Sequence, residues 1–341
     1  MLRHKRFWFA LVLLVFLGWT YSWTYTPYGR LDYRAAFSLR LLSFETEYQP
    51  VPEMDFSFKL PVNLIYPASA LLPAHTVADT KDLSIPGEVD IPARLYTPEG
   101  EAPEGGWPLI VYYHGGGFVV GSVEIFDPLT RELSAEAGVQ VLSVDYRLAP
   151  KDPYPAAIND AYAALVWAEQ NASSLGANPT KLMVGGDSAG GNIAAVMALM
   201  TRDRQGPNII GQILYYPAVD VSGGLLSASG PNFADGYGLS TEAMMAFRTA
   251  YYGDRDPHGD PYLSPILAES VSDLAPALVV TAGFDPLTET ARQYSQRMID
   301  SGVEVTEAHF SDMIHGFMSI GLFPQQNEAM AQTVVFVNGL K

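Results

Sequence analysis

Residues 184–192 read VGGDSAGGN, a single serine set among glycines. The run KLMVGGD (181–187) is apolar and typical of a buried strand, whereas AAVMALM (194–200) is typical of a helix. Ser188 is therefore expected where a strand turns into a helix. Residues 186–190 fit the pattern G-x-S-x-G, in which small neighbours allow the serine to occupy a sharp, strained turn. The alternative is a glycine-rich loop that happens to contain a serine.

Apolar runs of similar length recur from about residue 83 onwards. They are ARLYTP (93–98), PLIVYYHG (108–115), GVQVLSVDY (138–146), KLMVGGD (181–187), GQILYYPA (211–218), ALVVTAG (277–283) and VEVTEAHF (303–310). Segments with helical spacing lie between several of them, for example at 155–169 and 288–299. Apolar strands that alternate with helices predict an α/β fold, in which helices cover both faces of a mostly parallel sheet.

Two segments depart from this alternation and are interpreted as parts of a cap. Residues 27–75 are rich in aromatic residues and proline without a clean periodicity, which predicts irregular or short helical structure. Residues from about 220 to 264 are rich in Gly, Ser and Tyr and contain one expected helix, from Thr241 to Tyr251. The second segment is then an insertion in a main domain that spans residues 76–341.

Composition excludes several classes of protein. The chain has 341 residues, of which 48% are hydrophobic, enough for one large domain or one domain with a smaller lobe. The net charge of −17 argues against nucleic acid as a partner, because phosphates would repel it. The absence of cysteine excludes a disulfide framework, a thiolate nucleophile and Cys-ligated zinc.

The first 26 residues have a composition of their own. Basic residues at positions 3, 5 and 6 precede an uncharged run from Phe7 to Trp19, and a cluster of Trp and Tyr follows. This pattern is typical of a signal peptide or a membrane anchor. Because no Ala-x-Ala-like cleavage site follows, we expect residues 1–26 to form a retained apolar helix that anchors the chain to a membrane. The rest would then be periplasmic or extracellular, and secretion after cleavage is the alternative.

A second glycine-rich segment follows another expected strand. A serine hydroxyl needs a base to become a good nucleophile, and its attack on a carbonyl creates an oxyanion that needs hydrogen-bond donors. The segment YYHGGGF (112–118) offers consecutive glycine N–H groups, which together with the N–H of Ala189 could form such an oxyanion hole. A structural turn and a phosphate loop are the alternatives, but a phosphate loop would need Gly-Lys-Ser/Thr, which is absent. His114 is expected to organise the loop.

The base has to come from the six histidines of the chain. His309 falls within an expected strand and is interpreted as structural, whereas His315 follows that strand on a loop, where sheets of this type assemble their sites. The acid should lie between the serine and the histidine in chain order. Asp285 directly follows the strand ALVVTAGF, and Glu289 on the next helix is the reserve. Ser, Asp and His in this order, each just past an expected strand, predict a catalytic triad.

Five motifs resemble those of one family. HGGGF (114–118), DYRLAP (145–150), GDSAGGN (186–192), FDPL (284–287) and HGF (315–317) are similar to motifs of the bacterial hormone-sensitive-lipase-like esterases, which have the α/β-hydrolase fold. The resemblance covers roughly residues 75–341. It implies Ser188 as the nucleophile, His315 as the base and Asp285 as the acid that orients it. The implied oxyanion donors are Gly116, Gly117, Ala189 and, less favoured, Gly115.

The resemblance has two departures and leaves the substrate open. Lys151 stands where the family usually has an acidic residue. The expected N-terminal anchor is a second departure, because the usual members of the family are soluble. Asp145 and Arg147 are expected to be structural. The predicted function is hydrolysis of small-molecule esters with short- to medium-chain acyl or aryl groups, through an acyl-enzyme and without a cofactor or metal. An amide, carbamate or N-formyl hydrolase with the same triad, or a non-catalytic ligand receptor on this fold, is the alternative.

Overall fold

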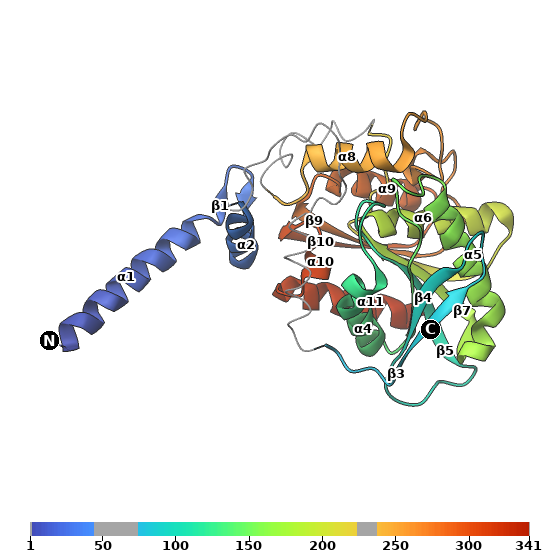
Figure 1. Cartoon of the computed structure of the whole chain (residues 1–341), viewed down its shortest axis with the longest axis horizontal. Helices are drawn as coiled ribbons and strands as arrows, with labels where there is room; N and C mark the ends of the chain where they lie inside the picture. Colours follow the sequence, from blue (N-terminus) through green and yellow to red (C-terminus); the bar gives the residue numbers. More distant parts are fainter. Residues whose placement is uncertain (1, 44–73, 224–236, 341) are drawn as a thin grey trace.

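The computed structural model describes residues 2–43, 74–223 and 237–340. Within them, an eight-stranded sheet has the strand order β10-β9-β8-β7-β5-β6-β4-β3, and helices cover both of its faces (Figure 1). β4 runs antiparallel to β3 and β6, and all other neighbours in the sheet are parallel. The predicted α/β class with a mostly parallel sheet is therefore confirmed.

Each of the seven expected strands has a counterpart, and an eighth strand lies at one edge. The strands are β3 (Asp79–Ile85), β4 (Ile91–Thr97), β5 (Trp107–Tyr113), β6 (Gln140–Val144), β7 (Ala177–Asp187), β8 (Ile209–Tyr215), β9 (Ala277–Phe284) and β10 (Val305–Ile314). The additional strand is β3, most of whose residues are exposed. A polar edge strand lacks the apolar run by which the others were predicted. A separate two-residue pair, β1 (Tyr25–Thr26) and β2 (Gly29–Arg30), follows the first helix.

The helices divide between the two faces of the sheet. They are α1 (Leu2–Ser22), α2 (Tyr33–Ser43), α4 (Val123–Ala137), α5 (Ala156–Asn171), α6 (Ala189–Arg204), α8 (Thr241–Tyr252), α9 (Thr288–Asp300), α10 (Phe317–Ile320) and α11 (Pro324–Leu340). Helices α5, α6 and α9 cover one face, and α4 and α11 cover the other. A hydrophobic core lies on each face of the sheet, and side chains of β5 point alternately into the two cores. Leu109 and Val111 pack into the core under α5, α6 and α9, and Ile110 and Tyr112 pack into the core under α4 and α11.

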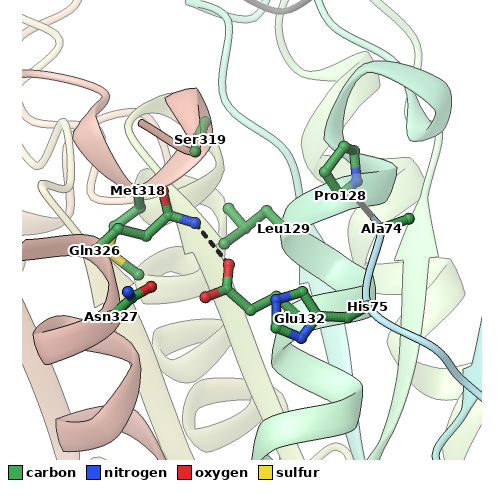
Figure 2. A pocket seen from close by; sticks show the side chains of 10 residues that line it. Ala74, His75, Pro128, Leu129, Glu132, Met318, Ser319, Gln326 and Asn327 are labelled. Carbon is green, nitrogen blue, oxygen red and sulfur yellow. Dashed lines mark hydrogen bonds between the residues drawn. The ribbon is translucent and has the colours of Figure 1, made fainter. Parts of the chain in front are cut away.

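A cavity of about 90 Å³ lies between α4 and the segment α10–α11 (Figure 2). Glu132 of α4 is buried beside it and accepts a hydrogen bond of 2.6 Å from Gln326 of α11. Burial raises the pKa of the Glu132 carboxyl, and the hydrogen bond from Gln326 lowers it. This contact joins the two helices that cover the second face of the sheet.

The described residues do not support the predicted membrane anchor in residues 1–26. In the part of the chain that the structure covers, no helix is both long enough and sufficiently apolar to cross a membrane. Helix α1 begins at Leu2 within the basic segment and ends at Ser22, so its uncharged part is shorter than the roughly 20 residues that a spanning helix needs. The alternative, a cleaved signal segment, stays a prediction.

The predicted cap is described only in part. Helix α8 confirms the helix expected from Thr241 to Tyr251, and α2 lies in the N-terminal cap segment. Residues 44–73 and 224–236, which belong to the two cap segments, lie outside the described residues. The boundaries of the cap therefore stay a prediction.

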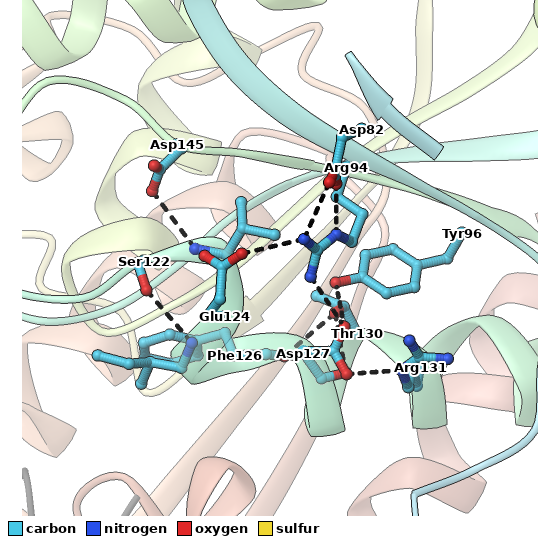
Figure 3. A network of polar contacts seen from close by, with 12 residues as sticks. Asp82, Arg94, Tyr96, Ser122, Glu124, Phe126, Asp127, Thr130, Arg131 and Asp145 are labelled. Atoms are coloured by element: carbon cyan, nitrogen blue, oxygen red, sulfur yellow. Dashed lines mark hydrogen bonds and ion pairs between the residues drawn. The ribbon is translucent and has the colours of Figure 1, made fainter. Parts of the chain in front are cut away.

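A polar network ties α4 to the antiparallel edge of the sheet (Figure 3). Arg94 of β4 contacts Asp82 of β3 and also reaches Glu124 and Asp127 of α4. The hydroxyl of Tyr96, a fully buried residue, donates to Asp127 Oδ1 at 2.9 Å. Asp127 thus accepts hydrogen bonds from two neighbouring side chains of β4, and this fixes the start of α4 against the strand.

We expect Asp127→Ala to lower the free energy of unfolding by about 1–3 kcal/mol, because the buried Tyr96 hydroxyl would lose its carboxylate acceptor. Urea denaturation monitored by circular dichroism measures this change. Asp82→Ala is the matched control: this carboxylate also pairs with Arg94, but its side chain is 73% exposed, so its removal should leave the denaturation midpoint unchanged. Equal losses in the two variants would show that the buried hydroxyl is not the cause.

Candidate active site

Ser188 lies on the turn between β7 and α6 in a strained backbone conformation. Its φ of 55° and ψ of −116° are outside the regions that residues other than glycine favour. A Cβ atom at Gly186 would collide with the carbonyl oxygen of Gly190, and one at Gly190 would collide with that of Tyr113. The glycines around the serine are therefore required by the close approach of the turn to the end of β5.

The three residues predicted as a triad form one hydrogen-bonded line. His315 Nε2 lies 2.9 Å from Ser188 Oγ, and His315 Nδ1 lies 2.8 Å from Asp285 Oδ2. Asp285 is 1% exposed, and its other oxygen accepts the N–H of Leu287 at 2.8 Å. A carboxylate can only accept, so Nδ1 carries the proton and Nε2 offers its lone pair to the serine hydroxyl. This arrangement can remove a proton from Ser188 during attack on an electrophile.

An aromatic ring fixes the other side of the imidazole. The ring of Tyr216 packs edge-on against His315, with 4.9 Å between the ring centroids. Tyr216 directly follows β8 and is 1% exposed. The histidine is thus held by the carboxylate of Asp285 and by the ring of Tyr216. Nothing in the sequence singles out Tyr216, because an aromatic residue at a strand end gives no signal of its own.

The glycines of the loop His114–Phe118, called the oxyanion loop below after the role predicted for it, differ in what their N–H groups contact. The N–H of Gly115 donates to Asp187 Oδ1 at 2.9 Å and is not free to bind an oxyanion, which argues against the prediction that included Gly115. Gly116 and Gly117 have φ values of 116° and 62°, which favour glycine. Among the described residues, no acceptor contacts the N–H of Gly116, Gly117 or Ala189.

His114 organises the oxyanion loop and does not act on Ser188. It is fully buried, stacks on Tyr146 with 4.4 Å between ring centroids, and bonds through Nδ1 to the carbonyl oxygen of Gly115 at 2.7 Å. Burial lowers the pKa of His114 to about 4, whereas the hydrogen bond to Gly115 raises it. The imidazole is therefore neutral at pH 7 and serves as a donor to the loop.

The remaining predicted residues have structural contacts. His309 lies within β10 and bonds to Thr281 at 3.0 Å. Arg147 contacts Asp160 through two nitrogens, at 2.7 and 2.9 Å. Glu289, the reserve acid, lies on α9 and accepts from Gln293. None of these three side chains contacts Ser188 or His315 through a hydrogen bond that the described structure contains.

Helix α8 packs directly on the oxyanion loop. The ring of Tyr251 stacks on Phe118 with 3.8 Å between centroids and an interplanar angle of 4°. A Cβ atom at Gly117 would collide with the ring of Phe247, so this ring lies on Gly117 itself. An apolar side chain of the predicted cap therefore borders the loop next to Ser188.

Comparison with known proteins identifies the family. The model of a family described as alpha/beta hydrolase fold matches residues 110–319. The carboxylic ester hydrolase LipN of Mycobacterium tuberculosis is 45% identical over 249 residues. The matched region covers 71% of this chain and 65% of LipN, which is less than two thirds of LipN's length. The carboxylesterase NlhH of the same species is 38% identical over 74% of this chain and 78% of its own length.

A solved structure extends the similarity to three dimensions. The hyperthermophilic esterase from the archaeon Pyrobaculum calidifontis superimposes with a TM-score of 0.83 at 36% sequence identity, over 91% of this chain and 98% of that one. The family model, the relatives and the solved structure point to the same family as the five sequence motifs. The chain belongs to the hormone-sensitive-lipase-like esterase family of the α/β-hydrolase fold.

Proposed function

We propose that the chain is a serine carboxylesterase in which Ser188 is the nucleophile, His315 the general base and Asp285 the orienting acid. The observation that carries the proposal is the line of two hydrogen bonds, 2.8 and 2.9 Å long, from the buried Asp285 to the Ser188 hydroxyl. The relatives named as carboxylic ester hydrolase, carboxylesterase and esterase support the ester as the bond that is cleaved.

The reaction would proceed in two acyl-transfer steps. His315 Nε2 takes the proton of Ser188 as Oγ attacks the ester carbonyl, and Asp285 stabilises the imidazolium that forms. The N–H groups of Gly116, Gly117 and Ala189 would bind the oxyanion. His315 then protonates the leaving alcohol. Water repeats the attack on the acyl-enzyme with the same groups and releases the acid.

The type of bond that is cleaved distinguishes the proposed esterase from an amide, carbamate or N-formyl hydrolase. Amides, carbamates and N-formyl groups could be cleaved by the same residues, but their nitrogen leaving groups depend more strongly on protonation. Paired esters and amides with the same acyl group separate the two. A higher kcat/KM for the amide member would replace the esterase proposal with an amidase.

Ser188→Ala and His315→Asn are each expected to lower kcat by several orders of magnitude, because the remaining residues cannot replace a missing triad member. His309→Asn is the matched control, since His309 lies on the preceding strand and bonds only to Thr281 among its described hydrogen-bond partners. Hydrolysis of a chromogenic acyl ester measures the change, with circular dichroism to verify folding. Comparable losses in the folded His309→Asn and His315→Asn variants would contradict the assignment of the base.

We also expect kcat/KM to rise from acetyl to about butyryl or hexanoyl esters and then to fall. Each methylene buried in an apolar pocket contributes about 0.8 kcal/mol until the available space is filled. Phe247 lies on Gly117 and would limit the space for chains bound near the oxyanion loop. Initial rates on a series of acyl esters from C2 to C16 measure the profile.

A pair of variants on α8 tests whether Phe247 limits the length of the acyl chain. Phe247→Ala should move the optimum to longer chains, whereas Met245→Ala should not, because Met245 is 59% exposed on the same helix. A steady increase of kcat/KM beyond C12 in the unmodified protein, or activation by emulsified triglyceride, would show an interfacial lipase instead of a short-chain esterase.

A further inference from the structure

The carboxylate of Asp187 lies beside Ser188 but takes no part in the acyl transfer described above. Asp187 is the last residue of β7, directly precedes Ser188 and is 2% exposed. Burial of a carboxylate is unfavourable unless hydrogen-bond donors compensate for the lost water. An acid at this place therefore implies a specific set of contacts.

Donors from three segments converge on this carboxylate. Oδ1 accepts the N–H of Gly115 at 2.9 Å and the hydroxyl of Tyr112 at 2.8 Å, and Oδ2 accepts the hydroxyl of Ser319 at 3.3 Å. Gly115 belongs to the oxyanion loop, Tyr112 to β5 and Ser319 to α10, which follows His315. The side chain thus connects the turn that carries Ser188 to the loop opposite it.

The contact with Gly115 leaves no room for a side chain. A Cβ atom at Gly115 would collide with Oδ2 of Asp187 and would lie 3.0 Å from its carbonyl oxygen. The hydrogen bond to the carboxylate fixes the position of the Gly115 backbone. The peptide groups of the next two residues are covalently attached to this fixed point. A displacement of Gly115 would therefore move the N–H groups of Gly116 and Gly117.

A second set of contacts extends towards the base. The hydroxyl of Ser319 also lies 3.3 Å from that of Tyr216, whose ring packs against the imidazole of His315. Through Ser319, the carboxylate is connected to the ring that borders the proposed base. The same acid is thus linked to both sides of the reaction centre.

We propose that Asp187 is a positioning residue for the oxyanion hole: its carboxylate holds Gly115 so that the N–H groups of Gly116 and Gly117 face the carbonyl oxygen that Ser188 attacks. This inference rests on the proposed function. Because the oxyanion forms only in the transition state, Asp187 acts on kcat and not on KM.

The charge of Asp187 adds a pH dependence of stability. Burial raises the pKa of its carboxyl to about 6, against the hydrogen bonds from Tyr112, Gly115 and Ser319 and the electrostatic effect of the nearby His315, which lower it. The titratable groups that face it are Tyr112, Tyr146, Tyr215 and His315. A folded-state pKa above the unfolded value near 3.9 means that folding favours the protonated form, so this contribution to stability is lost as pH rises through about 6. The asparagine side chain does not ionise, so the Tm of Asp187→Asn minus the Tm of the unmodified protein should increase from pH 4 to pH 8.

Turnover per active site tests the positioning role, with sites counted by a phosphonate reaction taken to completion. Asp187→Ala should lower kcat by about 10²–10³-fold, the loss typical of an oxyanion donor, and change KM by less than about threefold. Asp187→Asn keeps an acceptor oxygen for Gly115 and should lose less than about tenfold in kcat. The affinity for a trifluoromethyl ketone, whose adduct with Ser188 carries an oxyanion, should fall in parallel with kcat.

A double-mutant cycle tests the contact itself. Gly115→Ala should lower kcat in the unmodified chain, because its methyl group displaces the carboxylate, and should cost little more in the Asp187→Ala background. Additive losses would overturn the proposal. If Asp187→Ala does not fold, Gly115→Ala alone decides, since an unchanged kcat per titrated site in this variant also overturns it.

Two controls separate the possible failures. Glu132→Ala removes another buried acid, which is 5% exposed and lies on the cavity beside α4 (Figure 2), and should lower Tm but leave kcat per site unchanged. The same result for Asp187→Ala would show a purely structural role and overturn the inference. Turnover that survives Ser188→Ala would refute the proposed function, whereas an inactive Ser188→Ala with a fully active Asp187→Ala would refute only this inference.

Discussion

The close approach of the β7–α6 turn to the end of β5 is the constraint on which the site depends. A side chain at Gly186 or Gly190 would collide with a backbone carbonyl oxygen, so the helix can begin beside the sheet only with glycine at both positions. The same approach holds Ser188 at a positive φ. Because β5 and β7 are neighbouring parallel strands, the oxyanion loop after β5 and the turn after β7 meet at one edge of the sheet.

Two buried carboxylates flank this turn, and their partners give them different properties. Asp285 contacts the imidazole of His315, a group that can take up a proton during a reaction. Asp187 contacts only hydroxyls and a backbone N–H through its described hydrogen bonds, so its partners hold it in place without exchanging a proton at neutral pH. We therefore interpret Asp285 as part of the proposed reaction and Asp187 as part of the support of the loop.

Local patterns predicted the buried part of the fold well and its periphery poorly. Seven strands were predicted from apolar runs because both faces of the central sheet are covered, as the buried residues of β5 and β6 show. β3 was missed because it lies at the edge and most of its residues are exposed. In residues 1–26 the apolar composition suggested a membrane anchor, but the length of uncharged helix decides whether a segment can cross a bilayer.

The sequence by itself determined how seven of the strands alternate with helices along the chain, the position of Ser188 at a strand–helix junction, and the preference for His315 over His309. These features depend on local patterns and chain order. Only the tertiary structure decided that the N–H of Gly115 belongs to Asp187, that Tyr216 borders His315, and that Phe247 lies on Gly117. Such contacts join residues far apart in the chain, and the order and register of the strands bring them together. No local pattern specifies the order of the strands within the sheet or their register.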